Sequence, residues 1–129
     1  MITKPTHPSY ANMIYRGETT VWERFSAPGK RIGSHNHHFM ADVSAWYLRH
    51  IVGISVNPFY NDPDFVAIQP KFIKSLEFAK GSYATPNGKV AVEWKRINGK
   101  IYLNVQTEGS AKFALGKGVE DLCENIEIA

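Results

Sequence analysis

The segment "KVAVEWKRINGKIYLNVQ", residues 89–106, has the clearest structural pattern in the chain. Apolar and polar residues alternate on both sides of Asn98-Gly99, and the apolar members are Val90, Val92, Trp94, Ile101, Leu103 and Val105. A period of two places alternate side chains on one face of a strand. Asn-Gly tolerates the positive φ angles of a type I′ turn. The segment therefore predicts a β-hairpin with one buried face.

Similar patterns extend outward from this hairpin. We expect strands at about 65–69, 75–84, 89–97, 100–107 and 110–115. The last four should form an antiparallel meander, with Asn87-Gly88 as a second type I′ turn. Short strands at this spacing predict a mainly β fold, an antiparallel β-sandwich of jelly-roll-like form. Its expected core contains Val92, Trp94, Leu103 and Phe113. Residues 116–129 fit a helical turn, a final strand or both.

The N-terminal part is aromatic-rich and helical in pattern. Apolar residues recur with helical spacing over about 37–52, at Phe39, Val43, Trp46, Tyr47, His50 and Ile51. Ser34 or Asn36 is the expected N-terminal cap, and Gly53 suits the left-handed C-terminal position. We read Trp46 and Tyr47 as packing residues. A shorter helix is predicted after Pro8, ending at Gly17.

A loop separates these two parts of the chain. In "SVNPFYNDPDF", Pro58 and Pro63 forbid regular pairing, and Asn57 favours a turn. We therefore divide the chain into residues 1–56 and 57–129. The helix face that carries Phe39, Val43, Trp46 and His50 should either dock on the sandwich or form a homodimer.

Composition excludes several classes of protein. The 129 residues carry a net charge of +3 without a long basic block, which gives nucleic-acid binding little support. No apolar run approaches the roughly 20 residues that span a bilayer. The single cysteine, Cys123, forms no intrachain disulfide and favours a cytoplasmic location. The N-terminus lacks an apolar signal region, so any signal peptide would lie upstream of this chain.

The most suggestive chemical pattern is Trp22-Glu23-Arg24 followed by a histidine cluster. Glutamates in such a segment are most often solvated surface residues. The functional interpretation is a sugar site, because indoles stack on sugar C–H faces and glycoside hydrolysis uses carboxylates. Arg24, Asn36 and His37 would then bind hydroxyl groups.

The histidines also permit a second interpretation. Gly29 precedes His35 and His37 with the spacing of the first half of a cupin metal motif. Asp42 would be a further ligand of such a site. The helical period after His37 argues against a cupin strand, and we expect neither a metal nor another cofactor.

The order of the motifs resembles the C-terminal end of bacterial α-L-rhamnosidases over roughly residues 8–115. The residues that carry this resemblance are Thr19-Thr20-Val21-Trp22-Glu23-Arg24, Asn36-His37, Trp46-Tyr47-Leu48, Gly53-Ile54 and the hairpin from Gly81 to Gly88. The resemblance implies the end of an (α/α)6 barrel, contributing one or two helices, followed by a C-terminal β-sandwich. It also implies an inverting hydrolase of terminal α-L-rhamnose, acting on a rhamnose-containing glycoside.

The resemblance assigns roles to the candidate residues. Glu23 corresponds to the general base, and His37 contacts the sugar. Trp22, Arg24 and Asn36 are the other expected substrate contacts, with Trp22 as a wall of the pocket. Two residues depart from the family pattern. His38 stands where an aromatic residue is common after Asn-His, and Phe25 replaces a frequent second Trp.

The resemblance is incomplete. A twelve-helix barrel needs several hundred residues, and the upstream general acid is absent from this chain. We therefore expect a truncated piece that is inactive when isolated. The alternative function is a non-catalytic β-sandwich that binds carbohydrate or supports a neighbouring domain.

Overall fold

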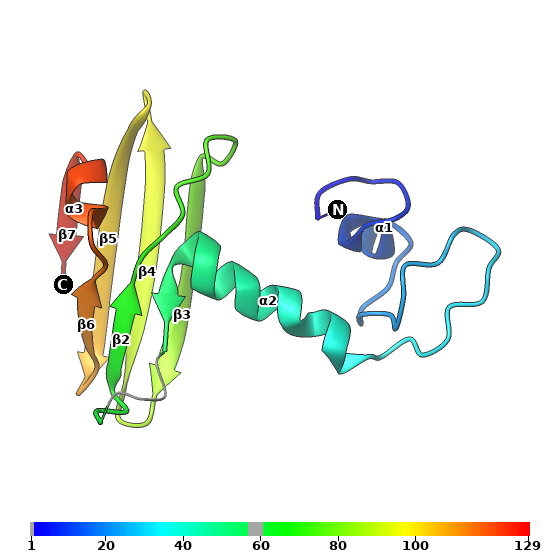
Figure 1. Cartoon of the computed structure of the whole chain (residues 1–129), viewed down its shortest axis with the longest axis horizontal. Coiled ribbons are helices and arrows are strands. Elements are labelled where there is room, and N and C mark those ends of the chain that lie inside the picture. Colours follow the sequence, from blue (N-terminus) through cyan, green and yellow to red (C-terminus); the bar gives the residue numbers. More distant parts are fainter. Residues whose placement is uncertain (1, 57–60) are drawn as a thin grey trace. The chain divides into compact units, whose positions relative to one another are not determined.

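The computed structural model describes residues 2–56 and 61–129, and the chain divides into two compact units (Figure 1). The first unit comprises Met1–Ala45, and the second comprises Trp46–Ala129. The sequence-based boundary between residues 56 and 57 stays a prediction. The turn expected at Asn57 and Pro58 lies outside the described residues.

Helical structure follows the sequence pattern closely. Helix α1 spans Tyr10–Tyr15, and Ser9 caps it by accepting a hydrogen bond from the Asn12 amide. Gly17 follows with φ of 81°, as predicted for the end of this helix.

Three consecutive segments form the predicted helix at 37–52: the 3₁₀-helix η1 (His38–Ala41), α2 (Asp42–Trp46) and the π-helix η2 (Tyr47–Val52). The expected caps Ser34 and Asn36 are wrong, because His37 occupies the N-cap without a side-chain bond. Gly53 ends the helix with φ of 95°, as predicted, and a Cβ there would meet the Pro70 nitrogen at 2.3 Å.

The second unit is a two-layered β-sandwich, which confirms the predicted fold class (Figure 1). One sheet has the order β1-β2-β6, from Ile54–Ser55, Phe65–Ile68 and Lys112–Leu115. The other has the order β3-β4-β5-β7, from Phe78–Thr85, Gly88–Ile97, Lys100–Gly109 and Asn125–Ile128. A short helix, α3 (Val119–Leu122), precedes β7, so residues 116–129 contain both a helical turn and a strand.

The predicted meander is correct for three strands and wrong for the fourth. Strands β3, β4 and β5 pair antiparallel in sequence order. Strand β6 instead crosses to the other sheet and pairs parallel with β2, and β7 pairs parallel with β5. Alternation predicts that a segment is a strand, but it contains no information about which strand becomes its partner.

The two Asn-Gly pairs behave differently. Asn98 and Gly99 have φ of 50° and 80°, which fits the predicted type I′ turn. The prediction for Asn87-Gly88 is wrong, since Gly88 already pairs with Thr85 in the ladder. A Cβ on Gly88 would lie 2.2 Å from the Glu108 carbonyl oxygen, so this glycine permits close backbone approach.

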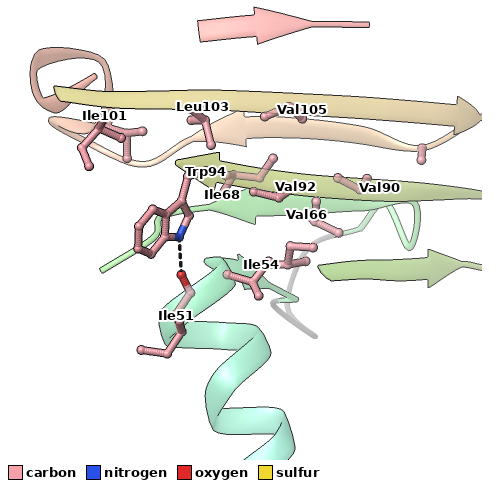
Figure 2. Packing of buried hydrophobic residues seen from close by; sticks show 13 residues of the cluster. Ile51, Ile54, Val66, Ile68, Val90, Val92, Trp94, Ile101, Leu103 and Val105 are labelled. Atoms are coloured by element: carbon pink, nitrogen blue, oxygen red, sulfur yellow. Dashed lines mark hydrogen bonds between the residues drawn. The ribbon is translucent and has the colours of Figure 1, made fainter. Parts of the chain in front are cut away.

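The sandwich core lies between the two sheets, as Figure 2 shows. Val92, Trp94 and Leu103 are buried, which confirms three of the four predicted core residues. Phe113 is only partly buried and packs at the margin of the core. Trp94 has no exposed surface, and its Nε1 donates a 2.7 Å hydrogen bond to the Ile51 carbonyl oxygen.

The last turns of the helix dock on this sandwich. Ile51 and Val52 are buried, and Tyr47 and Leu48 pack against the core. The packing role predicted for Trp46 is wrong, because 42% of it is exposed. The helix thus docks through residues other than those of the predicted face, and docking of that face is not confirmed, because its Phe39 and Trp46 are exposed. Self-association through the helix face stays a prediction.

Replacing Trp94 should test the connection between helix and sheet. Trp94→Ala removes a fully buried indole and leaves the Ile51 carbonyl without its donor. We expect a loss of about 3–5 kcal/mol in the free energy of unfolding, measured by urea denaturation. Trp46→Ala is the matched control and should change stability by only about 0.5 kcal/mol, because surface substitutions have small effects. Equal losses would contradict the packing described here.

A buried carboxylate fixes the turn between β3 and β4. Asp64 is 6% exposed, and its two oxygens accept 2.9 Å bonds from the Asn87 backbone amide and side-chain amide. These bonds hold the pKa of Asp64 below its ordinary value, with the Asn87 side chain as the largest cause. The stabilisation is therefore present above the unfolded-state pKa of about 3.9 and is lost as pH falls through the folded-state pKa.

Asp64→Asn should lower stability at pH 7 and flatten the acid side of the stability curve. The new amide replaces one acceptor oxygen with an NH2 group, which cannot accept the bond that this oxygen receives from Asn87. Urea unfolding between pH 2 and pH 7 measures both effects. Asp121→Asn, an exposed change on α3, should leave stability at pH 7 nearly unchanged. An unchanged pH profile in Asp64→Asn would be inconsistent with this role.

Candidate active site

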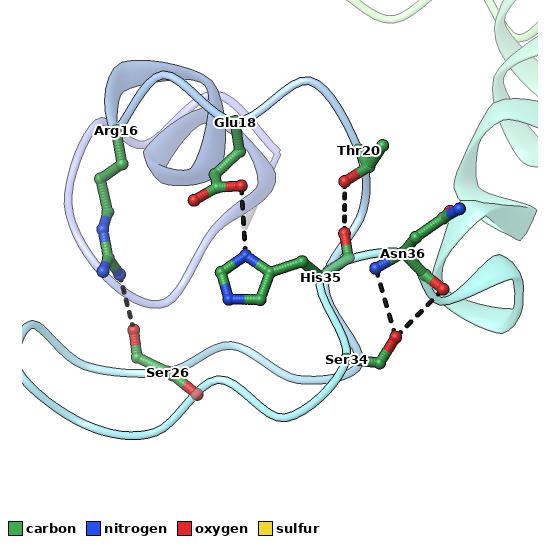
Figure 3. A network of polar contacts seen from close by, with 7 residues as sticks. All are labelled: Arg16, Glu18, Thr20, Ser26, Ser34, His35 and Asn36. Carbon is green, nitrogen blue, oxygen red and sulfur yellow. Dashed lines mark hydrogen bonds and ion pairs between the residues drawn. The ribbon is translucent and has the colours of Figure 1, made fainter.

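Two backbone segments of the first unit run side by side and position the candidate residues. The Glu23 amide donates to the Ser34 carbonyl at 2.9 Å, and the His37 amide donates to the Val21 carbonyl at 2.8 Å. The Thr20 hydroxyl adds a bond to the His35 carbonyl oxygen (Figure 3). Residues distant in sequence are thereby brought to one place, with the loop of residues 24–33 between them.

The carboxylate of Glu23 is held by its backbone neighbours and stays accessible. Its Oε2 accepts a 3.0 Å hydrogen bond from the Ser34 amide, while Oε1 lies 3.7 Å from the Arg24 guanidinium. The side chain is 38% exposed. The Ser34 bond, followed by the charges of Arg24 and His37, lowers the pKa of Glu23. The group is therefore ionised at neutral pH and has the charge state of a general base.

Gly33 provides the space for this carboxylate. It has φ of 88°, a region that favours glycine, and a Cβ there would lie 2.4 Å from the Glu23 Oε2. Both the backbone conformation and the close approach therefore require glycine. No sequence signal indicated this role, since Gly33 lies outside the motifs that carry the family resemblance.

Trp22 is packed inside the first unit. It is 1% exposed, and the Arg16 guanidinium carbon lies 4.4 Å from its ring centroid. The His35 ring approaches it edge-on at 6.0 Å. In this conformation the indole offers no face to a sugar. A substrate contact by Trp22 stays a prediction, and it requires Arg16 to move.

A second carboxylate, which sequence reasoning did not select, accompanies this tryptophan. The Glu18 Oε2 lies 3.4 Å from the His35 Nδ1 (Figure 3). The Trp22 indole N–H is the largest cause that lowers the pKa of Glu18, and His35 and Arg16 lower it further. Within the described residues, this N–H forms no hydrogen bond of regular geometry. Glu18 lies in the run "ETTVWERF", but its spacing alone did not distinguish it.

Helix α1 anchors the loop beside Glu23. The Arg16 Nη1 donates to the Ser26 carbonyl at 3.2 Å, and the Tyr10 and Phe25 rings meet edge-on at 5.0 Å (Figure 3 shows the first contact). Phe25, one of the departures from the family pattern, is therefore a packing residue. Phe25 in place of the family's frequent Trp changes how the loop packs on helix α1, and it leaves the charge around Glu23 unchanged.

The remaining predicted ligand contacts differ in their surroundings. Arg24 and Asn36 are exposed, and the backbone N–H of Asn36 donates a 3.2 Å hydrogen bond to the Ser34 hydroxyl. His37 is half-buried beside the His38 and Phe39 rings, at centroid distances of 6.0 and 5.5 Å. His37 is close enough to lower the pKa of Glu23.

The cupin interpretation gains no geometric support. Within residues 2–56 and 61–129, no three His, Cys, Asp or Glu side chains are grouped so as to hold a metal ion. The three ligands of that interpretation, His35, His37 and Asp42, all lie within these ranges. The described helices also contain none with the length and hydropathy needed to cross a membrane.

Each part of the chain matches a known protein family. Residues 1–51 match the bacterial alpha-L-rhamnosidase 6 hairpin glycosidase domain, and residues 64–118 match the bacterial alpha-L-rhamnosidase C-terminal domain. The chain thus combines a glycosidase-domain sequence with a C-terminal sandwich. It belongs to the bacterial α-L-rhamnosidase family, which confirms the resemblance seen in its motifs.

Individual relatives agree with this assignment. An alpha-L-rhamnosidase of Alteromonas sp. (strain LOR) is 33% identical over an alignment of 103 residues, covering 73% of this chain and 11% of that protein. One of Formosa agariphila is 29% identical over 112 residues, covering 81% of this chain and 12% of that protein. The structure of alpha-L-rhamnosidase from Dictyoglumus thermophilum matches with a TM-score of 0.70 and 26% identity, over 88% of this chain and 13% of that chain. The chain therefore spans about one tenth of the length of these relatives.

Substituting Gly33 should disturb the Glu23 carboxylate selectively. In Gly33→Ala the new methyl group meets Oε2, so the hydrogen bond from Ser34 should be lost and the pKa of Glu23 should rise toward its ordinary value. A carbon-detected NMR titration of the carboxyl groups measures this pKa.

Gly29→Ala is the matched control for this substitution. Gly29 has a similar φ of 75°, but a Cβ there meets nothing within 4 Å. Both variants should carry similar backbone strain, and only Gly33→Ala should change the pKa of Glu23. Equal pKa changes in the two variants would show that Gly33 does not set the carboxylate position.

Proposed function

We propose that this chain supplies the general base of an inverting α-L-rhamnosidase and that Glu23 is this base. The observation that supports it best is the Glu23 carboxylate itself, which is ionised, accessible and held by the Ser34 amide. A base for hydrolysis must accept a proton from water at the moment of attack. A carboxylate that is held through one oxygen, on a side chain that stays partly exposed, suits this task.

The proposed reaction requires groups beyond this chain. Water attacks the anomeric carbon of terminal α-L-rhamnose while Glu23 takes a proton from it. The bond from that carbon to the glycosidic oxygen breaks, and a general acid gives the leaving oxygen its proton. Inverting sites hold their two carboxyl groups about 6.5–9.5 Å apart to admit the water. The resemblance implies that this acid lies in the upstream part of the parent protein.

The neighbouring residues receive supporting roles in this proposal. His37 lies near enough to Glu23 to lower the pKa of this carboxyl, and it binds a sugar hydroxyl. Arg24 and Asn36 are exposed beside it and bind further hydroxyl groups. Glu18, paired with His35, holds the segment that carries Thr20 and Trp22 against the neighbouring segment. The substrate is a glycoside with a terminal rhamnose.

The decisive measurement uses a parent-length enzyme containing this sequence. Glu23→Gln should reduce turnover of an aryl α-L-rhamnoside by at least about 10²–10⁴-fold, because the amide cannot accept the proton. Rhamnose binding should be largely retained, since the shape of the side chain is kept. Glu18→Gln is the matched control and should affect turnover far less. Near-normal turnover in Glu23→Gln would overturn the assignment.

The isolated 129-residue chain should show no detectable hydrolysis of the same substrate. It lacks the general acid, and most of the groups that would position the sugar lie elsewhere in the parent. Such positioning can contribute about 7–11 kcal/mol to the lowering of the barrier. Steady release of the aryl group by the purified chain would contradict this expectation.

His37→Ala in the parent should weaken substrate binding and turnover together.

A further inference from the structure

A hollow with an apolar floor lies on the sandwich, apart from the residues of the candidate active site. It has a volume of about 420 Å³ and is bordered by the segment after β2, the β4–β5 turn and the start of α3. Phe72, Ile101, Val119 and Leu122 supply its apolar surface. Hollows of roughly 300–1,000 Å³ suit small organic molecules.

The polar lining of this hollow is cationic. Lys71, Lys74, Arg96 and Lys117 border it, and no carboxylate is among its lining residues in the described part of the chain. The three lysines are exposed, so their ammonium groups can move toward a ligand. The hollow thus combines positive charge at its rim with apolar surface below.

The concentration of unpaired lysines here is unusual for this unit. Residues 46–129 contain eight lysines, and four of them, Lys89, Lys95, Lys100 and Lys112, form ion pairs with carboxylates. Among the described residues, three of the four lysines without such a pair border the hollow, and Lys80 is the fourth. Their positive charge is therefore not neutralised by the protein itself.

Arg96 gives the hollow a preformed wall. Its Nη2 donates to the Phe72 carbonyl at 3.0 Å and to the Ile73 carbonyl at 3.3 Å, and its Nε reaches the Leu76 carbonyl at 3.4 Å. These bonds fix the segment that carries Phe72, and they use neutral acceptors, so the guanidinium keeps its full charge. A fixed wall lowers the ordering cost of binding a ligand.

We propose that this hollow binds a small organic anion with an aromatic or other planar apolar body, such as an aromatic carboxylate or sulfonate. The apolar body covers Phe72 and Leu122, and burial of this surface supplies most of the affinity. The anionic group lies at the lysine rim, where the unneutralised charge selects for an anion. This site is independent of the proposed hydrolysis and involves none of its residues.

The test uses the 129-residue chain with 8-anilinonaphthalene-1-sulfonate as the probe. Amide chemical-shift changes should localise at Phe72, Ile101 and Val119, and affinity should fall with rising salt. The uncharged analogue N-phenyl-1-naphthylamine should bind several-fold more weakly. Shift changes confined to other residues, or equal binding of the two probes, would overturn the proposal.

Charge-reversal variants provide a matched comparison. Lys117→Glu should weaken binding of the sulfonate roughly three- to tenfold, and Lys80→Glu, the same change at an unpaired lysine outside the hollow, should leave it unchanged. Circular dichroism checks that both variants are folded, and Lys74→Glu gives a second reading at the rim. An equal loss of affinity in the Lys80→Glu and rim variants would show that net charge alone controls binding, which would also overturn the proposal.

Discussion

The hydrogen bond from the Trp94 indole to the Ile51 carbonyl is the interaction on which the second unit depends. An indole with no exposed surface must find an acceptor, because an unpaired buried N–H costs about 1–3 kcal/mol. The acceptor comes from the end of η2, where the last carbonyl groups of a helix lack partners within it. One bond thus satisfies a sheet residue and a helix end, and Gly53 then turns the chain directly into β1.

The sequence predicted the local elements well, because their causes are local. Alternation around Asn98-Gly99 indicated the buried face of β4 and β5, and helical spacing indicated the segment that ends at Gly53. The partner of β6 was predicted wrongly, since pairing with β2 depends on contacts across most of the sandwich. The type I′ turn predicted at Asn87-Gly88 was wrong for a similar reason. Gly88 allows the backbone to approach the Glu108 carbonyl oxygen, which belongs to another strand.

The candidate site shows the same division between local and distant causes. Its motif identified Glu23 and His37, and the structure brings these residues within electrostatic reach of each other. Gly33 and Ser34 hold the carboxylate, and this role could not be predicted from the sequence because it depends on the pairing of two segments. Trp22 illustrates the reverse case, since an indole next to a carboxylate suggests a ligand surface, but this one is covered by Arg16.

The mixed strand pairing also has a consequence for the order of folding. The β3-β4-β5 hairpins pair residues that are close in sequence, so they close small loops and can form early. The pairs β2–β6 and β5–β7 join segments separated by whole strands, which makes their loop closure slower. During synthesis β2 emerges well before its partner β6, so its buried residues Val66 and Ile68 remain without their final cover in the interval. The meander is therefore the natural nucleus, and the other sheet assembles upon it.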